Sequence, residues 1–379
     1  MWSFLISKIA FDKVSLPGLL HKLQAAGLCD RSFVWCRSFL IGRKQRVRVG
    51  NQVSDLKDLK AGIPQGAILS PLLFSLYIND IVECAEAADF NLFADDTSAY
   101  VVAKSAATLQ SQLQTVLDKM SVWLRTWSVS VNFKKTALLV LSTKRSIPAV
   151  NISLDGHHIE QVSSHKHLGV VCNNRLRWSD HTTYLVKKAS KKIGLLRRFR
   201  RRLPELVVRR LYQTCIRPAL EYAGAAWSGI GAMDNEKLER VQRSAARLVA
   251  RLSAREDISH ELLLARAGLE PLRLRRLSPL ATTVLKLTWK QPRGPDHLVS
   301  AYKGFCSLSP PNTSQMSLRG DDNTRLPRAR TEYLRHSPFY MALKFLLSLP
   351  ASCKKSLSAL RISSFITLLI RHLACSPSL

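Results

Sequence analysis

Two adjacent carboxylates, Asp95 and Asp96, separate two short apolar runs of the chain. The runs, residues 90–93 and 98–102, have the length and composition of β-strands, so the pair is expected at the turn of a hairpin. Such a turn is often solvated and has no chemistry. The alternative is a magnesium site, because carboxylate oxygens at a hairpin tip suit a cation that organises phosphates in nucleotidyl transfer. The turn alone leaves both interpretations open.

The segment 61–74, upstream of the turn, predicts a loop followed by a helix. Ser70 is a good helix cap, and Pro71 fits the first helical position, where its missing N–H sacrifices no hydrogen bond. The expected helix has a broad apolar face, made of Leu72, Leu73, Leu76, Ile78 and Ile81. Two glycines bracket a Pro-Gln pair before the cap, so the backbone can approach another surface and leave the Gln65 amide projecting. An ordinary glycine-rich loop is the alternative.

Together these strings resemble the reverse transcriptases of non-long-terminal-repeat (non-LTR) retrotransposons, most closely the jockey-like group. The matching strings, in the family's order and at suitable spacing, are residues 62–66, 72–74, 77–80 and 93–96. Further matches are residues 10–14, 19–23, 132–136 and 167–170, and, for the family's thumb, 212, 215–223 and 238–243. The resemblance extends from about Ala10 to about Leu277.

The resemblance implies an α/β (α+β) fold, a right-hand polymerase palm with an antiparallel sheet followed by a helical thumb. It also implies RNA-directed DNA synthesis with two Mg²⁺ ions, which stabilise the attacking and leaving oxygens. The implied partners are an RNA template, a DNA primer or RNA–DNA hybrid, and a dNTP. The implied domains are a palm at residues 1–180 and a basic helical thumb at 181–290. Beyond the resemblance, a stretch rich in Pro, Ser, Gly and Asn predicts a linker at 291–328, and alternation of apolar residues with Lys and Arg predicts a small helical tail at 329–379.

Individual roles follow from the same resemblance. Asp95 and Asp96 would be the catalytic residues and metal ligands. Four residues would contact the nucleotide or template, namely Phe11, Gln65, Gly66 and Lys135. The turn that grips the primer end would be formed by His167, Leu168 and Gly169.

One departure from the family's pattern bears on catalysis. Active members carry an aspartate that bridges both ions, six residues before the position of Asp12, where this chain has Ile6. An alternative alignment places Leu5 there, and the first eleven residues contain no carboxylate. Because small misplacements of a reacting group already slow a reaction by orders of magnitude, we expect this copy to be inactive or nearly so.

The family's fingers and the first part of its palm are also expected to be missing, as in a truncated copy or a fragment. A rival hypothesis is a non-catalytic nucleic-acid-binding or interaction protein that retains the palm-thumb fold. A third is that the truncated palm does not fold stably.

The charge of the chain points to an anionic polymer as partner. The net charge is +30, and residues 187–210 hold eleven Lys or Arg against the single acid Glu205. This stretch predicts two helices broken at Leu203-Pro204. Its candidate contacts to a sugar-phosphate backbone are Lys187, Lys188, Lys191, Lys192, Arg197 and Arg198. A solvated basic face or a nuclear-localisation cluster is the alternative.

The remaining sequence patterns predict structural elements and indicate no further chemical site. Amphipathic helices are expected at residues 109–127 and 234–252, and in the first of these Trp123 and Trp127 are expected in the core. No Cys-x-x-Cys pair occurs among the eight cysteines, and a loose histidine group at 157–181 has no standard zinc spacing. No membrane or export segment is visible, so an intracellular location in the nucleus and cytoplasm is expected.

Overall fold

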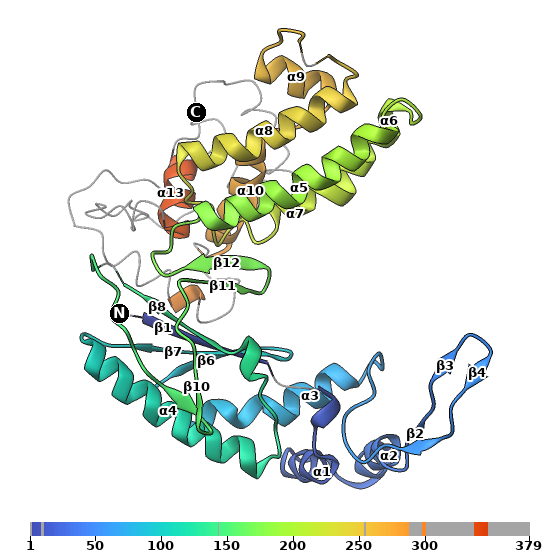
Figure 1. The fold of residues 1–379 in the computed structure, drawn as a ribbon, viewed down its shortest axis with the longest axis vertical. Helices are drawn as coiled ribbons and strands as arrows, with labels where there is room; N and C mark the ends of the chain where they lie inside the picture. The colour runs from blue at the N-terminus through green and yellow to red at the C-terminus, as the bar shows by residue number, and fades with distance from the viewer. Residues whose placement is uncertain are drawn as a thin grey trace. The chain divides into compact units, whose positions relative to one another are not determined.

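The computed structural model describes residues 2–8, 11–142, 144–253, 255–287, 298–300 and 337–347 of the 379-residue chain. They belong to two compact units, Met1–Arg177 and Trp178–Leu379, which are described separately (Figure 1). None of the helices in these ranges is both long and apolar enough to span a bilayer.

An antiparallel sheet of four strands organises the first unit. The strands are β1 (Trp2–Lys8), β6 (Asp89–Phe93), β7 (Asp96–Val102) and β8 (Ala137–Leu141). Their order in the sheet is β6-β7-β1-β8, so β1 pairs with both β7 and β8. The antiparallel sheet expected from the sequence is therefore present.

Helices cover the sheet and complete the core of this unit. The long helix α4 (Ala106–Thr126) lies along one face of the sheet (Figure 1). Its apolar stripe is buried together with Val101, Leu138 and Val140 of the sheet, and consists of Leu109, Leu113, Val116, Leu117 and Met120. Ser105 caps α4 by accepting a 3.1 Å hydrogen bond from the backbone N–H of Thr108. The helix predicted at 109–127 is thus confirmed.

The remaining elements of the first unit are short. The helices are η1 (Phe11–Lys13), α1 (Leu16–Ala25), α2 (Asp30–Leu40), α3 (Ser70–Ile78), η2 (Asn79–Cys84) and η3 (Phe133–Lys135). A ribbon is built from two strand pairs, β2 (Lys44–Gln45) with β5 (Lys57–Asp58) and β3 (Arg48–Val49) with β4 (Gln52–Val53). Two small hairpins are β9 (Ser153–Leu154) with β10 (His157–His158) and β11 (Ser164–His167) with β12 (Val170–Asn173).

The predicted role of Ser70 was wrong. Helix α3 begins at Ser70 itself, its N-cap position is Leu69, and no side chain caps it. The Ser70 hydroxyl is buried and donates instead to the carbonyl of Pro64. Because it lies inside the first turn, Ser70 fastens the preceding loop to the helix.

The second unit is helical. Its elements are α5 (Ser179–Phe199), α6 (Glu205–Leu211), the π-helical turn η4 (Tyr212–Ile216), α7 (Arg217–Glu221), α8 (Ala232–Val249), α9 (His260–Ala267), α10 (Leu272–Leu287) and α13 (Pro338–Leu347). The predicted break is confirmed, since Pro204 precedes the first residue of α6. The helix predicted to end at residue 252 stops at Val249, and Arg251 adopts a φ of +57°.

The expected linker and tail fall mostly outside the described residues. Within the linker range 291–328 the structure describes residues 298–300, which are helical, and within the tail range 329–379 it describes residues 337–347, which include α13. The division of the chain into these four domains stays a prediction.

Candidate active site and nucleic-acid surface

The two carboxylates lie at the tip of a hairpin, as predicted. Phe93 of β6 and Asp96 of β7 form the last strand pair, and Ala94 and Asp95 connect them. Ala94 adopts a φ of +50°, a left-handed conformation that a two-residue turn between twisted strands requires. Asp95 and Asp96 are both half-buried. The hairpin is confirmed, and the catalytic role of the two residues stays a prediction.

The strand next to this turn is β1. Lys8 pairs with Asp96, and Ile6 pairs with Ser98 on β7 and with Ala137 on β8. Positions two apart on a strand share a face, so position 6 lies on the same face of the sheet as position 96. The position at which the family resemblance requires an aspartate is therefore next to the turn, and an isoleucine occupies it.

The loop that carries Gln65 is fixed to the segment after β1. The Gln65 side-chain amide donates a 2.7 Å hydrogen bond to Oδ1 of Asp12, and the Gly62 N–H donates a 2.8 Å bond to the Val14 carbonyl. Gly62 has a φ of +84°, and a Cβ there would lie 2.8 Å from the Asp12 carbonyl oxygen, so only glycine fits. Arg43 donates to the Gly62 carbonyl.

Residues 8 to 12 thus connect the carboxylate turn with the loop that carries Gln65. Its first residue, Lys8, pairs with Asp96, and its last residue, Asp12, holds Gln65. Phe11 precedes Asp12 in η1. Lys135 is exposed in η3, directly before β8, and Gly66 follows Gln65 with a φ of +84° in open space.

The predicted primer-grip residues form a tight turn between β11 and β12. His167 pairs with Val170, and Leu168 and Gly169 adopt φ angles of +44° and +83°, as a type I′ hairpin turn requires. Burial lowers the pKa of His167, and the carboxylate of Asp96 partly opposes this shift. Burial and the neighbouring His167 lower the pKa of His165, and the carboxylate of Asp96 again opposes the shift. This hairpin therefore lies within electrostatic reach of the carboxylate turn, and its role in gripping a primer stays a prediction.

Asp95 and Asp96 do not belong to a larger group of metal-binding side chains in the described part of the chain. Among the described residues no group of three or more His, Cys, Asp or Glu side chains is placed to hold a metal ion. Asp95 and Asp96 alone do not complete the oxygen ligands that two Mg²⁺ ions need. The strand paired with Asp96 contributes no carboxylate, and the nearest one along the chain, Asp12, is bonded to Gln65.

The six predicted backbone-binding cations all lie on α5, and they do not share one face. At 100° per residue, Lys187, Lys191 and Arg198 fall within about 40° of one another and form a stripe. Lys188 lies 5.9 Å from the centre of the Tyr184 ring, and Lys192 donates a 2.7 Å hydrogen bond to the Cys215 carbonyl in η4. The stripe of Lys187, Lys191 and Arg198 is therefore the best candidate for contacts to phosphates.

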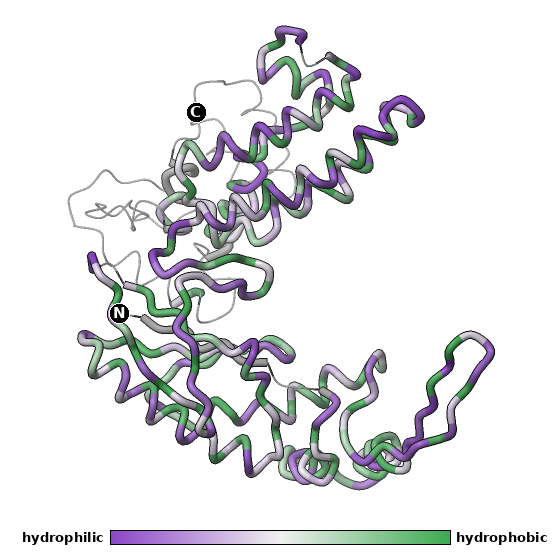
Figure 2. Tube along the Cα trace, in the orientation of Figure 1, coloured by the Kyte–Doolittle hydropathy of each residue, from purple (hydrophilic) through white to green (hydrophobic). Residues whose placement is uncertain are grey.

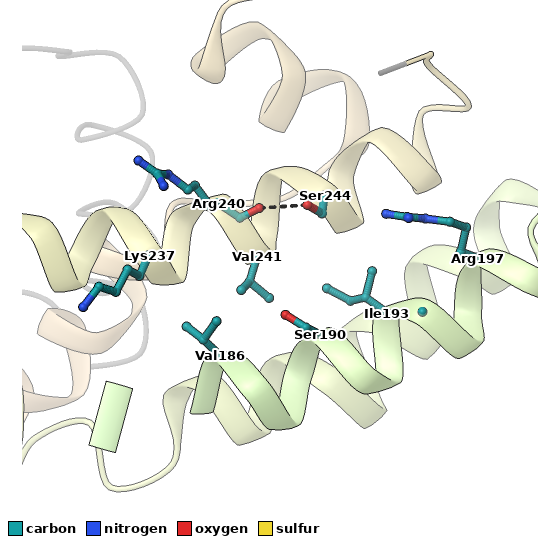
Figure 3. A pocket seen from close by; sticks show the side chains of 9 residues that line it. Val186, Ser190, Ile193, Arg197, Lys237, Arg240, Val241 and Ser244 are labelled. Carbon is teal, nitrogen blue, oxygen red and sulfur yellow. Dashed lines mark hydrogen bonds between the residues drawn. The ribbon is translucent and has the colours of Figure 1, made fainter. Parts of the chain in front are cut away.

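The sixth cation, Arg197, lines a groove between α5 and α8. The groove has a volume of about 440 Å³, and Ile193 and Val241 point into it from the two helices (Figure 3). Lys237 and Arg240 of α8 line it as well. Neither residue was among the predicted phosphate contacts, and the available signal was their spacing of three residues on an amphipathic helix.

The thumb-like string at residues 212–223 contributes mainly to the core of the second unit. The buried Tyr212 hydroxyl donates a 2.7 Å hydrogen bond to Oε1 of Gln242, whose amide donates a 2.7 Å bond to the Glu270 carbonyl. Burial raises the pKa of Tyr212, so this hydroxyl keeps its proton as a donor. Glu221 and Arg275 form an ion pair nearby.

Comparisons with known proteins agree with the sequence motifs. Residues 3–179 match the family described as reverse transcriptase (RNA-dependent DNA polymerase). The chain is 28% identical over 283 residues to the RNA-directed DNA polymerase from mobile element jockey of Drosophila melanogaster, an alignment that covers 70% of this chain and 30% of that protein.

Two further relatives show the same pattern. The jockey polymerase of Drosophila funebris is 29% identical over 261 residues (66% of this chain, 28% of that protein). The probable RNA-directed DNA polymerase from transposon BS of Drosophila melanogaster is 28% identical over 259 residues (65% of this chain, 28% of that protein). This chain thus spans 28–30% of the length of these three relatives.

Proposed function

We propose that the family reaction of this chain is RNA-directed DNA synthesis and that this copy is catalytically impaired. The premise is that residues 3–179 belong to the reverse transcriptase family and that the chain is related to the non-LTR retrotransposon polymerases of the jockey group. In that reaction the 3′-hydroxyl of a primer attacks the α-phosphate of a dNTP and pyrophosphate leaves. The proposed partners are an RNA template with a DNA primer, or an RNA–DNA hybrid.

One observation carries the assignment of the site. The family match covers the sheet in which Asp95 and Asp96 occupy a hairpin tip beside β1, with the Gln65 loop fixed to the segment that follows β1. In this arrangement Asp95 and Asp96 would hold divalent metal, Gln65, Gly66, Phe11 and Lys135 would contact template and nucleotide, and residues 167–169 would hold the primer end. The metal would be Mg²⁺.

Ile6 is the basis for the proposed impairment of catalysis. Its backbone position next to the turn suits a ligand shared by two ions, yet its side chain offers no oxygen. Without a bridging ligand, the attacking hydroxyl lacks the charge stabilisation that a second ion supplies.

Primer extension tests this proposal. The purified chain, an annealed RNA template and DNA primer, dNTPs and Mg²⁺ are incubated beside an Asp95→Ala control. We expect the two proteins to give the same extension, at the level of the buffer blank. Extension that Asp95→Ala abolishes would contradict the impairment and support the site, because another residue would then supply the missing ligand.

A second candidate function is nucleic-acid binding without catalysis, favoured by the stripe of Lys187, Lys191 and Arg198. Replacing the three by Ala should make the plot of log affinity against log salt shallower by about 2 to 3, since each phosphate contact contributes about 0.9. The matched control replaces Lys188, Lys192 and Arg197, which carry the same charge on other faces. Equal effects of the two variants would assign the binding to net charge.

A further inference from the structure

The β2–β5 ribbon is an exposed arm of the first unit. It projects away from the sheet and its covering helices (Figure 1 and Figure 2), and every residue from 44 to 58 is exposed. Val47 and Val49 are 62% and 74% exposed, and Val53 and Leu56 are exposed as well. A two-stranded ribbon with no core of its own is marginally stable in water, so this arm gains stability when a partner covers it.

Charged and uncharged residues alternate along the first side of the ribbon. Lys44, Arg46 and Arg48 alternate with Gln45, Val47 and Val49 along the chain. Lys44 begins β2, Arg48 begins β3 and Arg46 lies between the two strands, so the three cations form a row along about 13 Å of extended chain. Lys44 pairs with Asp58 and Arg48 with Val53, and between these pairs the Ser54 N–H donates a 2.9 Å hydrogen bond to the Val47 carbonyl.

The charges of the row remain available to a ligand. The ion pair of Lys44 with Asp58 is exposed and 3.6 Å long, a geometry that contributes little. Arg48 donates through Nε to the Gly50 carbonyl at 3.0 Å, which leaves four of its five N–H donors for other acceptors. Residues 43–60 hold six Lys or Arg against Asp55 and Asp58, so the arm attracts a polyanion.

The shape of the arm discriminates among polyanions. The major groove of B-form DNA is wide enough for a two-stranded ribbon, and it offers phosphates and guanine acceptors to cations and thymine methyl groups to apolar side chains. The major groove of A-form RNA is too deep and narrow for side chains to read. A ribbon whose first side carries three exposed cations and two exposed valines in alternation fits the first groove.

We propose that the β2–β5 ribbon binds double-stranded B-form DNA in its major groove, with Lys44, Arg46 and Arg48 on phosphates and base edges and Val47 and Val49 on apolar base edges. This surface is distinct from the proposed template and primer site and from the stripe on α5. The inference does not depend on polymerase activity.

The test uses one duplex sequence prepared as DNA, as RNA and as an RNA–DNA hybrid, titrated with the full chain by fluorescence anisotropy over a range of salt concentrations. The variant Lys44→Ala with Arg46→Ala and Arg48→Ala should lower DNA affinity at least tenfold and flatten the DNA salt slope by about 2 to 3. Affinity for the two A-form duplexes should change less than twofold.

Two further variants sharpen the result. Replacing Arg31, Lys104 and Lys119 by Ala removes three exposed charges from the same unit outside the ribbon and should leave the preference for DNA intact. Arg46→Lys with Arg48→Lys keeps the charge and should retain most of the DNA affinity, which excludes loss of folding as the cause.

Three outcomes would overturn the proposal. Equal losses of affinity for DNA, RNA and hybrid in the triple-alanine variant would show that the row attracts any polyanion without specificity. An equal loss of DNA affinity in the charge-matched control would show the same. Dissociation of a self-associated chain by Val47→Ser with Val49→Ser, at unchanged DNA affinity, would assign the ribbon to a protein partner.

Discussion

The side-chain amide of Gln65 donates a 2.7 Å hydrogen bond to the carboxylate of Asp12, across 53 positions of the sequence. The bond orients an exposed amide at the end of a loop whose other end is fixed by Gly62. In the proposed site this amide faces template or nucleotide, so Asp12 would act as a positioning residue for Gln65.

We expect Asp12→Ala to free the Gln65 loop without unfolding the chain. Because both side chains are exposed, the free energy of unfolding should fall by less than about 1 kcal/mol. Hydrogen exchange of the backbone amides in residues 62–66 should accelerate. Asp12→Asn keeps an acceptor oxygen and should exchange like the unmodified protein, and equal exchange in all three would show that Gly62 and Arg43 fix the loop alone.

The position of Ile6 predicts a gain of metal affinity by a single substitution. Ile6→Asp places a third carboxylate on the face of the sheet that carries position 96, whereas Leu5→Asp pairs with Ala99 and places it on the opposite face. Since the number of charged ligands sets the affinity of oxygen sites, Mn²⁺ should bind Ile6→Asp roughly tenfold more tightly than the unmodified chain. Electron paramagnetic resonance of free Mn²⁺ measures this. Equal gains in the two variants would contradict the alignment of β1 with the turn.

The carboxylate hairpin and several helices were predictable because their signals are local. Apolar residues on both sides of Asp95 and Asp96 fixed β6 and β7, and helical periodicity fixed α4 and α8 to within a few residues. The end of α8 was missed because Leu252 continues the apolar pattern after the backbone has left the helix.

Contacts between distant residues were not predictable from local pattern. Nothing near Asp12 indicates Gln65, and the stripe of three cations on α5 emerged only when the contacts of Lys188 and Lys192 were known. The same holds for Lys22, a charged residue of α1 that is buried. Trp123 and Trp127 belong to the core, as expected, but they surround this cation.

Lys22 should be an important residue for stability. Its ammonium group lies 3.8 Å from the centre of the Trp127 ring. It donates a 2.6 Å hydrogen bond to the Tyr77 carbonyl and forms a 2.5 Å ion pair with Asp80. Lys22→Met removes the cation and leaves these groups without it, which should lower the free energy of unfolding by about 2 to 4 kcal/mol. Asp80→Asn keeps the cation among its rings and should cost less, because Asp80 is partly exposed. Urea denaturation compares them, and a loss below about 1 kcal/mol in Lys22→Met would show that burial of the methionine compensates.

His181 should make the second unit sensitive to mild acid. Its imidazole is buried with its ring centre 5.1 Å from that of Trp227, and burial lowers its pKa from 6.5 to about 4. The unfolded chain therefore binds more protons than the folded chain between these values, so stability is complete above pH 6.5 and declines as the pH falls toward about 4. Hydrogen exchange of α5 at pH 7.5 and pH 5, corrected for intrinsic rates, should show this decline. The variant His181→Gln has no titrating group at this site and should lose most of the pH dependence, even if it is less stable at both values. The same dependence in His181→Gln would place the acid sensitivity in other groups.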